Sequence, residues 1–511
     1  MTYVRTPVVK INGTPADPDT IALPLTITAG RREPDQQPEP GGCTFTMPLA
    51  AVASVPKRGH TIEVLVELDT DLPIFTGRVI NVRAVHEPWQ AGSVAGYEIQ
   101  AAGWSSTYAN LPLGIGWRIG VNPEDEQFGE LQYLWTTKAG YTLDAPPLTY
   151  TGLDTTTLRN TLDVTADANL LPTLQDLATR TGALIWETPT DLQITGNGYR
   201  EDATPAGTIP AATVPEQIDY TPAELINDLT FSYGAYDQFA MTATYTEPKG
   251  IFEWEKTVMP ATPTTGEANY STFAKELRLH RTDYNGDPQT PWIAELKYGD
   301  LIVVRDLIND TYAGLLVTAW PAWSANFVTI PVQQLDGDWD ATSATGVFVA
   351  VWSNLNPPRA TRRAFRTASQ TEYGIRPAAT DTGSVLIGPA STRANAVLDR
   401  WKDDQWIASL QVRSDLATSQ EVWDDLIVLL APNTLVEVPN LWAEGGRVGP
   451  YDNQMWIEGV THEWNRTDGG RLIHTCDLVL TANNPDSAPA AGTYPSTSTY
   501  PATTLYPGGT P

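Results

Sequence analysis

The side chains best suited to bind a metal ion are few in this sequence, and most of the useful ones lie near its C-terminal end. The chain has five histidines and two cysteines, and Cys43 has no cysteine near it in sequence that would suggest a disulfide framework. His462 and His474 are close in sequence, and alternation along HTCDLVL would put His474 and Cys476 on one strand face. These residues offer at most three soft ligands, whereas a structural zinc site takes four. We therefore expect packed strand residues here, with no metal and no cofactor.

Motifs for nucleotide binding and hydrolysis are missing, because the sequence has no GxxxxGK[ST], GxSxG, HExxH or GxGxxG pattern. The stretch from Gly114 to Gly120 has the wrong glycine spacing and precedes acidic residues that would repel a phosphate, so we expect a loop. Asp336, Asp338 and Asp340 alternate like the start of a calcium loop, but the later glycine and glutamate are absent. We expect no catalytic residue and no enzyme. A carboxylate pair for glycoside hydrolysis stays open, because it depends on a separation in space.

The chain is strongly acidic, with 32 Lys and Arg against 60 Asp and Glu, which gives a formal net charge of −28. This charge repels a phosphate backbone and argues against specific nucleic-acid binding. The densest basic cluster comprises Arg359, Arg362, Arg363 and Arg366. In so acidic a protein, we expect these arginines to pair with carboxylates of the chain itself or of a neighbour.

The elements that must position these side chains are mainly β-strands. The 511 residues suggest several domains, at roughly 100–200 residues each. Period-two alternation of apolar residues predicts strands at 43–47, 61–68, 241–245 and 474–480. No apolar run reaches the roughly 18 residues of a membrane span, and the first residues lack the pattern of a secretion signal.

Three helices are predicted within this β-rich chain. The first covers 172–182, where a proline can begin the helix and Gly182 can end it, and a β-hairpin follows at 183–195. The second carries apolar residues at helical spacing over 394–401. The third begins with Thr418 and Glu421 at capping-box spacing and ends before Pro432.

Two segments, 58–82 and 298–320, resemble each other. In each, a glycine turn (Gly59 or Gly299) precedes a strand, and a polar loop leads to an aromatic-x-Gly step into a second strand. The aligned positions pair Ile62 with Ile302, Val64 with Val304, Phe75 with Tyr312 and Gly77 with Gly314. The pattern indicates two related β-barrel domains in one chain, and chance likeness between two hairpins is the alternative.

The C-terminal segment 485–511 changes character, because it is rich in Pro, Thr, Ser and Gly and cannot bury a core. Within it Tyr494, Tyr500 and Tyr506 each precede a proline and recur every six residues. We expect an extended arm whose tyrosines bind a partner, and a disordered end is the alternative.

Several segments, in this order along the chain, carry a resemblance to a known family. They are Ile11-Asn12-Gly13, the strand at 43–47, the step Phe75 to Val79, the helix and hairpin at 170–195, the strand 227–234, Ser369-x-x-x-Tyr373-Gly374-x-Arg376, Leu429 to Val436, and Trp456 to His462. The sequence resembles the tail hub proteins of tailed bacteriophages, the minor tail or baseplate hub proteins of phages of actinobacteria.

The resemblance implies a mainly β, multidomain protein with α+β insertions, which forms a homotrimeric ring through which DNA passes. The expected domains are a β-barrel at 1–108, an α+β domain at 109–226, a second β-barrel at 227–366, an α+β domain at 367–484 and the arm at 485–511. The resemblance also implies a place at the distal end of the tail in the virion, after synthesis in the host cytoplasm.

Its expected partners are the tube or distal tail protein, the tape measure protein, and tip or receptor-binding proteins. Two alternatives come from other classes: a tail-associated cell-wall hydrolase, suggested by the many carboxylates, and a carbohydrate-binding β-protein, suggested by the 17 Trp.

Overall fold

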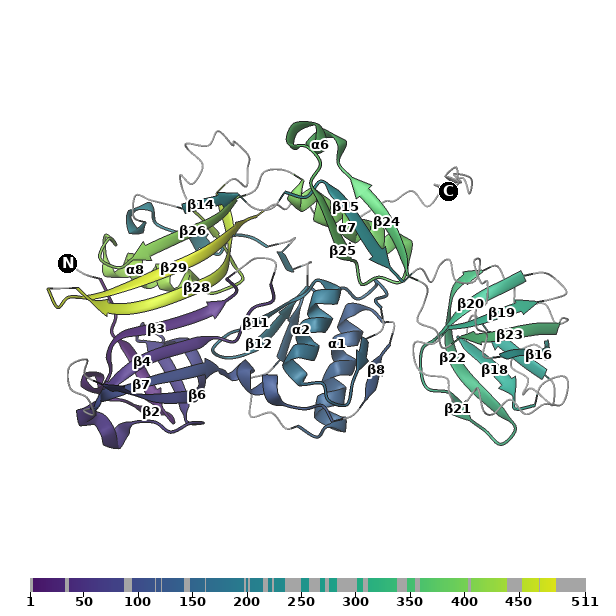
Figure 1. Ribbon diagram of the computed structural model, residues 1–511, viewed down its shortest axis with the longest axis horizontal. Helices are drawn as coiled ribbons and strands as arrows, with labels where there is room; N and C mark the ends of the chain where they lie inside the picture. Colours follow the sequence, from purple (N-terminus) through teal and green to yellow (C-terminus); the bar gives the residue numbers. More distant parts are fainter. Residues whose placement is uncertain are drawn as a thin grey trace.

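The computed structural model shows a mainly β, multidomain protein with few helices (Figure 1). The residues that it describes are 3–32, 36–86, 94–114, 116–120, 122–141, 148–160, 162–196, 199–200, 203–214, 219–222, 225–234, 250–256, 267–271, 275–282, 301–306, 311–337, 347–353, 359–402, 406–438, 453–467 and 469–483.

The largest sheet combines strands from both ends of the chain. Its N-terminal strands are β1 (Pro7–Ile11), β2 (Thr14–Pro15), β3 (Ala22–Gly30), β4 (Gly42–Pro48), β5 (Thr61–Val66), β6 (Leu72–His86) and β7 (Val94–Gly103). The later strands are β13 (Gly207–Thr208), β14 (Asp219–Pro222), β26 (Trp406–Arg413), β27 (Thr434–Glu437), β28 (Gln454–Arg466) and β29 (Leu472–Ala482).

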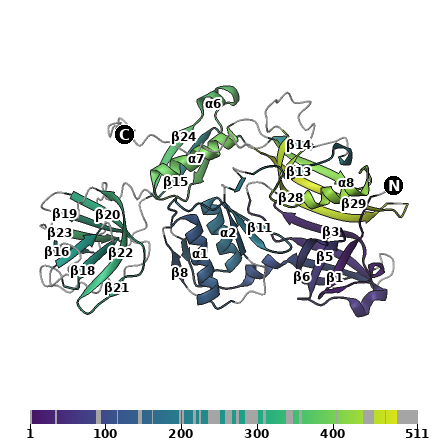
Figure 2. The same ribbon diagram turned by 180° about the vertical axis from the view of Figure 1, so that it is seen from behind.

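These strands run in the order β14-β26-β29-β28-β3-β4-β7-β6-β5-β1-β2, with β27 beside β28 and β13 beside β27. The two groups meet where β3 pairs with β28, from Gly30 opposite Gly459 to Leu25 opposite Trp464. The sheet curls as a half-barrel, and purple and yellow strands lie side by side in both ribbon views (Figure 2). The N-terminal group of strands ends with β7 at Gly103, and the sheet continues into strands from the C-terminal end of the chain.

Alternating side chains explain the two faces of this sheet. Along β4, Cys43, Phe45 and Met47 are buried while their neighbours are not, which confirms the strand predicted from the period-two pattern. The strand predictions at 61–68 and 474–480 are confirmed by β5 and β29. The strand predicted at 241–245 lies outside the described residues.

A helical unit follows the N-terminal strands. It contains β8 (Trp117–Ile119), α1 (Glu124–Tyr133), a π-turn (Leu134–Lys138), β9 (Leu148–Thr151), β10 (Leu162–Val164), α2 (Leu170–Thr181), β11 (Leu184–Glu187) and β12 (Leu192–Thr195). Buried residues of both helices and of the hairpin form one core. Gly182 ends α2 in the left-handed region, at φ 85°, as the sequence predicts.

A second α+β unit is built from segments far apart in sequence. Strand β15 (Asp228–Tyr233) lies between β24 (Ala360–Phe365) and β25 (Pro377–Asp381). Helix α7 (Ile387–Trp401) packs its Ala390, Ala394 and Leu398 on β15, and α6 (Thr367–Tyr373) lies nearby (Figure 1).

Between β15 and β24 the chain forms a ring of strands, drawn as a separate unit in Figure 1. The strands are β16 (Gly250–Lys256), β17 (Glu267–Ser271), β18 (Glu276–His280), β19 (Leu301–Asp306), β20 (Thr311–Val317), β21 (Ala322–Trp323), β22 (Phe327–Gly337) and β23 (Val347–Ser353). They run β18-β17-β16-β23-β19-β20-β22, and β22 pairs again with β18. The strands that connect into this ring therefore form a closed path.

The helix predictions met a mixed outcome. The helix predicted at 394–401 is the C-terminal part of α7, and the helix predicted at 418–431 contains α8 (Gln420–Leu429), whose cap is Ser419 and not Thr418. The prediction of only three helices was wrong, because α1 and α6 are also present. Short 3-10 turns add to them at Pro18–Thr20, Leu49–Ser54, Trp104–Asn110 and Ala211–Thr213. Within the described part of the chain, no helix combines the length and apolar character needed to cross a bilayer.

Candidate functional site: the buried junction of the large sheet and the helical unit

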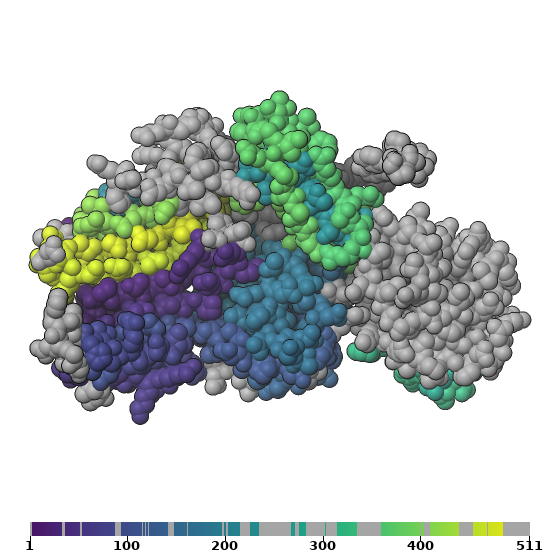
Figure 3. Space-filling view, viewed as in Figure 1, coloured from purple at the N-terminus to yellow at the C-terminus, as the bar shows by residue number. Residues whose placement is uncertain are grey.

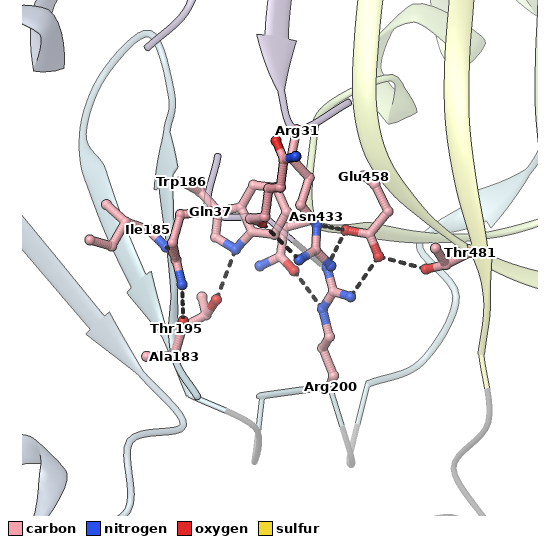
Figure 4. A network of polar contacts seen from close by, with 11 residues as sticks. Arg31, Gln37, Ala183, Ile185, Trp186, Thr195, Arg200, Asn433, Glu458 and Thr481 are labelled. Atoms are coloured by element: carbon pink, nitrogen blue, oxygen red, sulfur yellow. Dashed lines mark hydrogen bonds and ion pairs between the residues drawn. The ribbon is translucent and has the colours of Figure 1, made fainter. Parts of the chain in front are cut away.

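Three charged residues from distant parts of the chain meet where the large sheet contacts the helical unit (Figure 4). Arg31 follows the last residue of β3, Glu458 lies on β28, and Arg200 lies in the segment after β12. In the space-filling view, purple atoms of the N-terminal strands lie between yellow atoms of the C-terminal strands and blue atoms of the helical unit (Figure 3).

The Glu458 carboxylate accepts hydrogen bonds from both guanidinium groups. Arg31 Nε lies 2.7 Å from Oε2, and Arg200 donates from Nη1 to Oε1 at 2.8 Å and from Nη2 to Oε2 at 3.0 Å. Thr481 donates its hydroxyl to Oε1 at 2.5 Å, and Asn433 accepts from Arg200 Nε at 3.1 Å. Every carboxylate oxygen is thus satisfied by donors from at least two segments.

Burial determines the electrostatics of this cluster. Glu458 is 0% exposed and Arg31 is 5% exposed. Burial alone would raise the pKa of Glu458, but the charges and hydrogen bonds of Arg200 and Arg31 outweigh it and hold that pKa well below its usual range. The carboxylate is therefore charged at neutral pH, and removal of Glu458 would take away the counter-charge that Arg31 and Arg200 share.

Aromatic rings complete the junction. The Arg31 and Arg200 guanidinium carbons lie 5.6 and 5.5 Å from the centre of the Trp186 ring, and Arg200 lies 4.6 Å from Trp456. Trp186 belongs to β11, and its indole N–H donates to Thr195 at 2.9 Å. These cation–π contacts join the hairpin of the helical unit to the charges of the sheet.

Two glycines let the backbones approach closely enough for the cluster to form. Gly30 has φ +83°, and a Cβ there would lie 2.3 Å from the Glu458 carbonyl oxygen. A Cβ on Gly459 would lie 2.4 Å from the carbonyl oxygen of Arg31. Both positions therefore require glycine, one for its conformation and both for space.

A partly buried carboxylate, Glu187, joins the same two units nearby. Its Oε2 accepts from the backbone N–H of Gly41 at 3.1 Å and from the Ser105 hydroxyl. A Cβ on Gly103 would lie 2.0 Å from its Oε1. Burial raises the pKa of Glu187 to about 7, although the donors around it favour the charged form. Glu187 and His462 both line a cavity of about 90 Å³ between the two units.

The arginine cluster singled out from the sequence forms ion pairs within the chain. Arg366 pairs with Asp399 at 2.8 Å, Arg363 with Asp228 and Arg359 with Asp381, which confirms the ion-pair prediction for three of the four. The pairs with Arg363 and Arg366 lower the pKa values of Asp228 and Asp399.

The candidate partner-binding tyrosines, Tyr494, Tyr500 and Tyr506, lie outside the described residues, as do Asp338 and Asp340. The structure brings His462, His474 and Cys476 together and buries all three. Cys43 and Cys476 are free thiols in different cores, so no disulfide links them.

Sequence reasoning did not find the ionic junction. Arg31 and Glu458 are 427 positions apart, and Arg200 and Glu458 are 258 apart, so no local spacing connects them. The available signal was Glu458-Gly459 within the segment Trp456 to His462, which already carried the family resemblance.

Comparisons with known proteins give matches of fold only. No protein-family model and no curated protein sequence matches the chain. Matching solved structures include a tail protein from Neisseria meningitidis, with 10% identity, a TM-score of 0.47, and coverage of 94% of this chain and 98% of that one. A second is the 43 kDa tail protein of prophage MuSo2 from Shewanella oneidensis, with 12% identity, a TM-score of 0.45, and coverage of 94% and 98%.

A type VI secretion component from E. coli also matches, with 8% identity, a TM-score of 0.36, and coverage of 92% of this chain and 76% of that one. The matching structures are thus phage tail proteins and type VI secretion proteins, which agrees with the resemblance seen in the sequence. Because each TM-score is below 0.5, we draw no functional argument from the likeness itself.

Proposed function

We propose that this protein is a structural component of a phage tail tip, a homotrimeric hub ring that joins the tail tube to distal tip or receptor-binding proteins. The observation that carries the proposal is a repeated hairpin within one chain. Segments 58–82 and 298–320, which resemble each other in sequence, form the hairpins β5–β6 and β19–β20 in two separate β-rich units. Three chains would place six such units around an axis, which suits a junction between a sixfold tube and a threefold tip.

The domain layout belongs to this proposal. One β-barrel domain would span 1–108 and the other 227–366, with α+β domains at 109–226 and 367–484. The ionic junction supports a structural role, because Arg200, in the segment after β12, makes a bidentate contact with Glu458 on β28 of the large sheet.

The net charge of −28 fits the passage of DNA. A wall rich in carboxylates repels the phosphate backbone, so DNA would slide through the ring without adhering to it. The expected neighbours are the tube or distal tail protein, the tape measure protein and the tip proteins. The arm at 485–511 would dock on one of them through Tyr494, Tyr500 and Tyr506.

Electron cryomicroscopy of the purified full chain tests the ring. The proposal predicts threefold particles with a central channel and six β-rich units around it. If wild type and Glu458→Gln both give only single chains and no ring, the proposal is contradicted.

A cell-wall hydrolase is a second candidate, and Glu187 is the observation that favours it. A partly buried carboxyl whose pKa is raised to about 7 and which lines a cavity has the properties of a general acid. Glycoside hydrolysis needs a second carboxylate about 5–10 Å away, and Glu187 is the one carboxylate among the described residues that line this cavity. Release of soluble fragments from peptidoglycan by wild type and not by Glu187→Gln would favour the hydrolase over the hub.

Carbohydrate binding is a third candidate, favoured by two exposed tryptophans in the segment between β20 and β22. Trp320 is 59% exposed and Trp323 is 41% exposed. Exposed aromatic faces can stack on sugar rings as well as on protein partners. Saturable binding of a cell-wall glycan that is lost in Trp320→Ala would support this candidate.

A further inference from the structure

His462, His474 and Cys476 bring three soft ligand atoms into mutual contact. His462 Nδ1 lies 3.2 Å from His474 Nε2 and 3.2 Å from Cys476 Sγ, and Sγ lies 3.3 Å from His474 Nε2. The three residues are 2%, 1% and 0% exposed. The atoms form a nearly equilateral triangle within the protein interior.

The sheet and helix α8 fix this triangle. His462 on β28 lies directly opposite Cys476 on β29, and His474 shares the strand face of Cys476. Trp464 stacks on His474 at 3.9 Å between ring centres, and Trp423 of α8 meets the same ring edge-on at 5.3 Å. The ligand atoms are therefore held in position by packing.

Hydrogen bonds alone do not satisfy all three contacts. The His462 ring also bonds the backbone of Leu430, and Nδ1 faces the triangle, so a neutral ring that donates from Nε2 to Leu430 has only a lone pair at Nδ1. A closed triangle would need each atom to donate one hydrogen and accept another, which a ring nitrogen does not do. At least one contact is therefore left without a hydrogen, whereas a single cation would use all three lone pairs.

The separations match those around a metal ion. Zinc–nitrogen bonds of about 2.0–2.1 Å and zinc–sulfur bonds of about 2.3 Å put tetrahedral ligand atoms roughly 3.3–3.6 Å apart. The observed 3.2–3.3 Å is slightly shorter.

We propose that His462, His474 and Cys476 form a binding site for one thiophilic d¹⁰ cation, Zn²⁺ or Cu⁺. The thiol proton leaves to solvent as the sulfur–metal bond forms. The contact between His462 and the Leu430 backbone orients the ligating ring, as a second-shell contact does in metalloproteins. Cu⁺ would give a neutral three-coordinate site, whereas Zn²⁺ would take a fourth ligand from solvent.

His462 also lines the cavity of about 90 Å³ described above, and we propose that the ion approaches from that side. The sequence offers only three soft metal ligands here, fewer than the four of a structural zinc site, and so predicts packed residues without a metal. The proposal departs from that expectation because the structure adds the contact distances and the cavity. The ion would link β28 and β29 beneath α8, independently of whether the protein is a tail hub.

The test uses the full chain as wild type, Cys476→Ser, His462→Gln and, as a matched control, Cys43→Ser, which removes the other buried thiol from a different core. Each chelator-treated protein receives one equivalent of Zn²⁺, or of Cu⁺ without oxygen, and is desalted for elemental analysis. Co²⁺ is added separately as an optical probe, and circular dichroism checks the fold.

We expect about one ion per chain in wild type and Cys43→Ser, with a thiolate-to-cobalt charge-transfer band, and an affinity lower by a factor of roughly 10–100 or more in the other two. The metal retained decides between Zn²⁺ and Cu⁺. Folded wild type that binds neither ion and shows no cobalt–thiolate band would overturn the proposal. A band that persists in Cys476→Ser or disappears in folded Cys43→Ser would also overturn it. If Cys476→Ser does not fold, His462→Gln and wild type still decide the result.

Discussion

The two β-rich regions of the chain contain similar hairpins but treat their sheet edges differently. In the large sheet, β5 and β6 belong to the N-terminal group of strands. The last strand of that group, β3, pairs with β28 from the other end of the chain. In the ring, β19 and β20 belong to strands that close on themselves through β18 and β22. A shared hairpin therefore does not decide closure, which depends on the strand that reaches the free edge.

The hairpins also differ in register. Ile62 lies opposite Gly77, whereas Ile302, its aligned counterpart, lies opposite Leu315 and not Gly314. Because side chains alternate between faces, a shift of one residue exchanges the two faces of the second strand. The sequence alignment thus identifies the two hairpins correctly, but the strand pairing within the second hairpin is shifted by one residue relative to the first.

The largest effect should come from breaking the ionic junction of the large sheet. In Glu458→Gln, the buried Arg31 and the partly buried Arg200 lose the carboxylate that they share, so the free energy of the first unfolding transition in denaturant should fall by about 3–5 kcal/mol. The control Asp176→Asn breaks an exposed pair with Arg180 and should cost less than about 0.5 kcal/mol. Equal effects of the two variants would show that the junction is not a structural anchor.

The stability of the ring should fall when a buried side chain is removed where β18 pairs with β22. Leu277 on β18 is fully buried and lies opposite Ile330 on β22. Leu277→Ala should destabilise the ring by about 2–5 kcal/mol and leave the large sheet unaffected. Limited proteolysis should then cut first within 250–353. First cuts in the large sheet instead would show that the two regions unfold together.

A smaller effect is expected where the two halves of the large sheet meet. Gly30→Ala puts a Cβ into a left-handed residue against the Glu458 backbone, at a cost of about 1–3 kcal/mol. Gly388 in α7 has open space around it, so Gly388→Ala should be neutral or stabilising. Thermal unfolding of both variants separates steric conflict at the β3–β28 contact from a general effect of replacing glycine.

The pH dependence sharpens the same contrast. The pKa of Glu458 is depressed in the folded protein, so its stabilisation is complete above the ordinary carboxyl pKa of about 4.3 and is lost as the pH falls below it. As the pH falls below about 4.3, the free energy of unfolding of wild type should decrease more steeply than that of Glu458→Gln. Parallel profiles for the two proteins would contradict the assigned role of this carboxylate.

Local patterns in the sequence predicted the elements that depend on local physics. The α2 helix and its ending at Gly182 follow from apolar spacing and from a residue that tolerates positive φ. Helix α1 was missed because its buried face mixes Glu124 and Gln127 with Phe128 and Leu131, which weakens the apolar period. Its acidic first turn is nevertheless favourable at a helix N-terminus.

The junction and the soft-ligand triangle could not be predicted to the same degree. Arg31 and Glu458 come together through the β3–β28 pairing, which joins opposite ends of the chain, and Arg200 reaches them from the segment after β12. The sequence did place His474 and Cys476 on one face, as the structure confirms. The position of His462 opposite Cys476 depended on the pairing register of β28 and β29, which no local pattern supplies.

The mass of the full chain in solution, measured by light scattering over a range of salt and protein concentrations, tests the hub proposal most directly. One chain has a mass of 55.7 kDa. The hub account predicts a particle of three times that mass, persisting as salt screens the repulsion between acidic chains. A mass of 55.7 kDa under every condition, together with release of fragments from peptidoglycan, would contradict it.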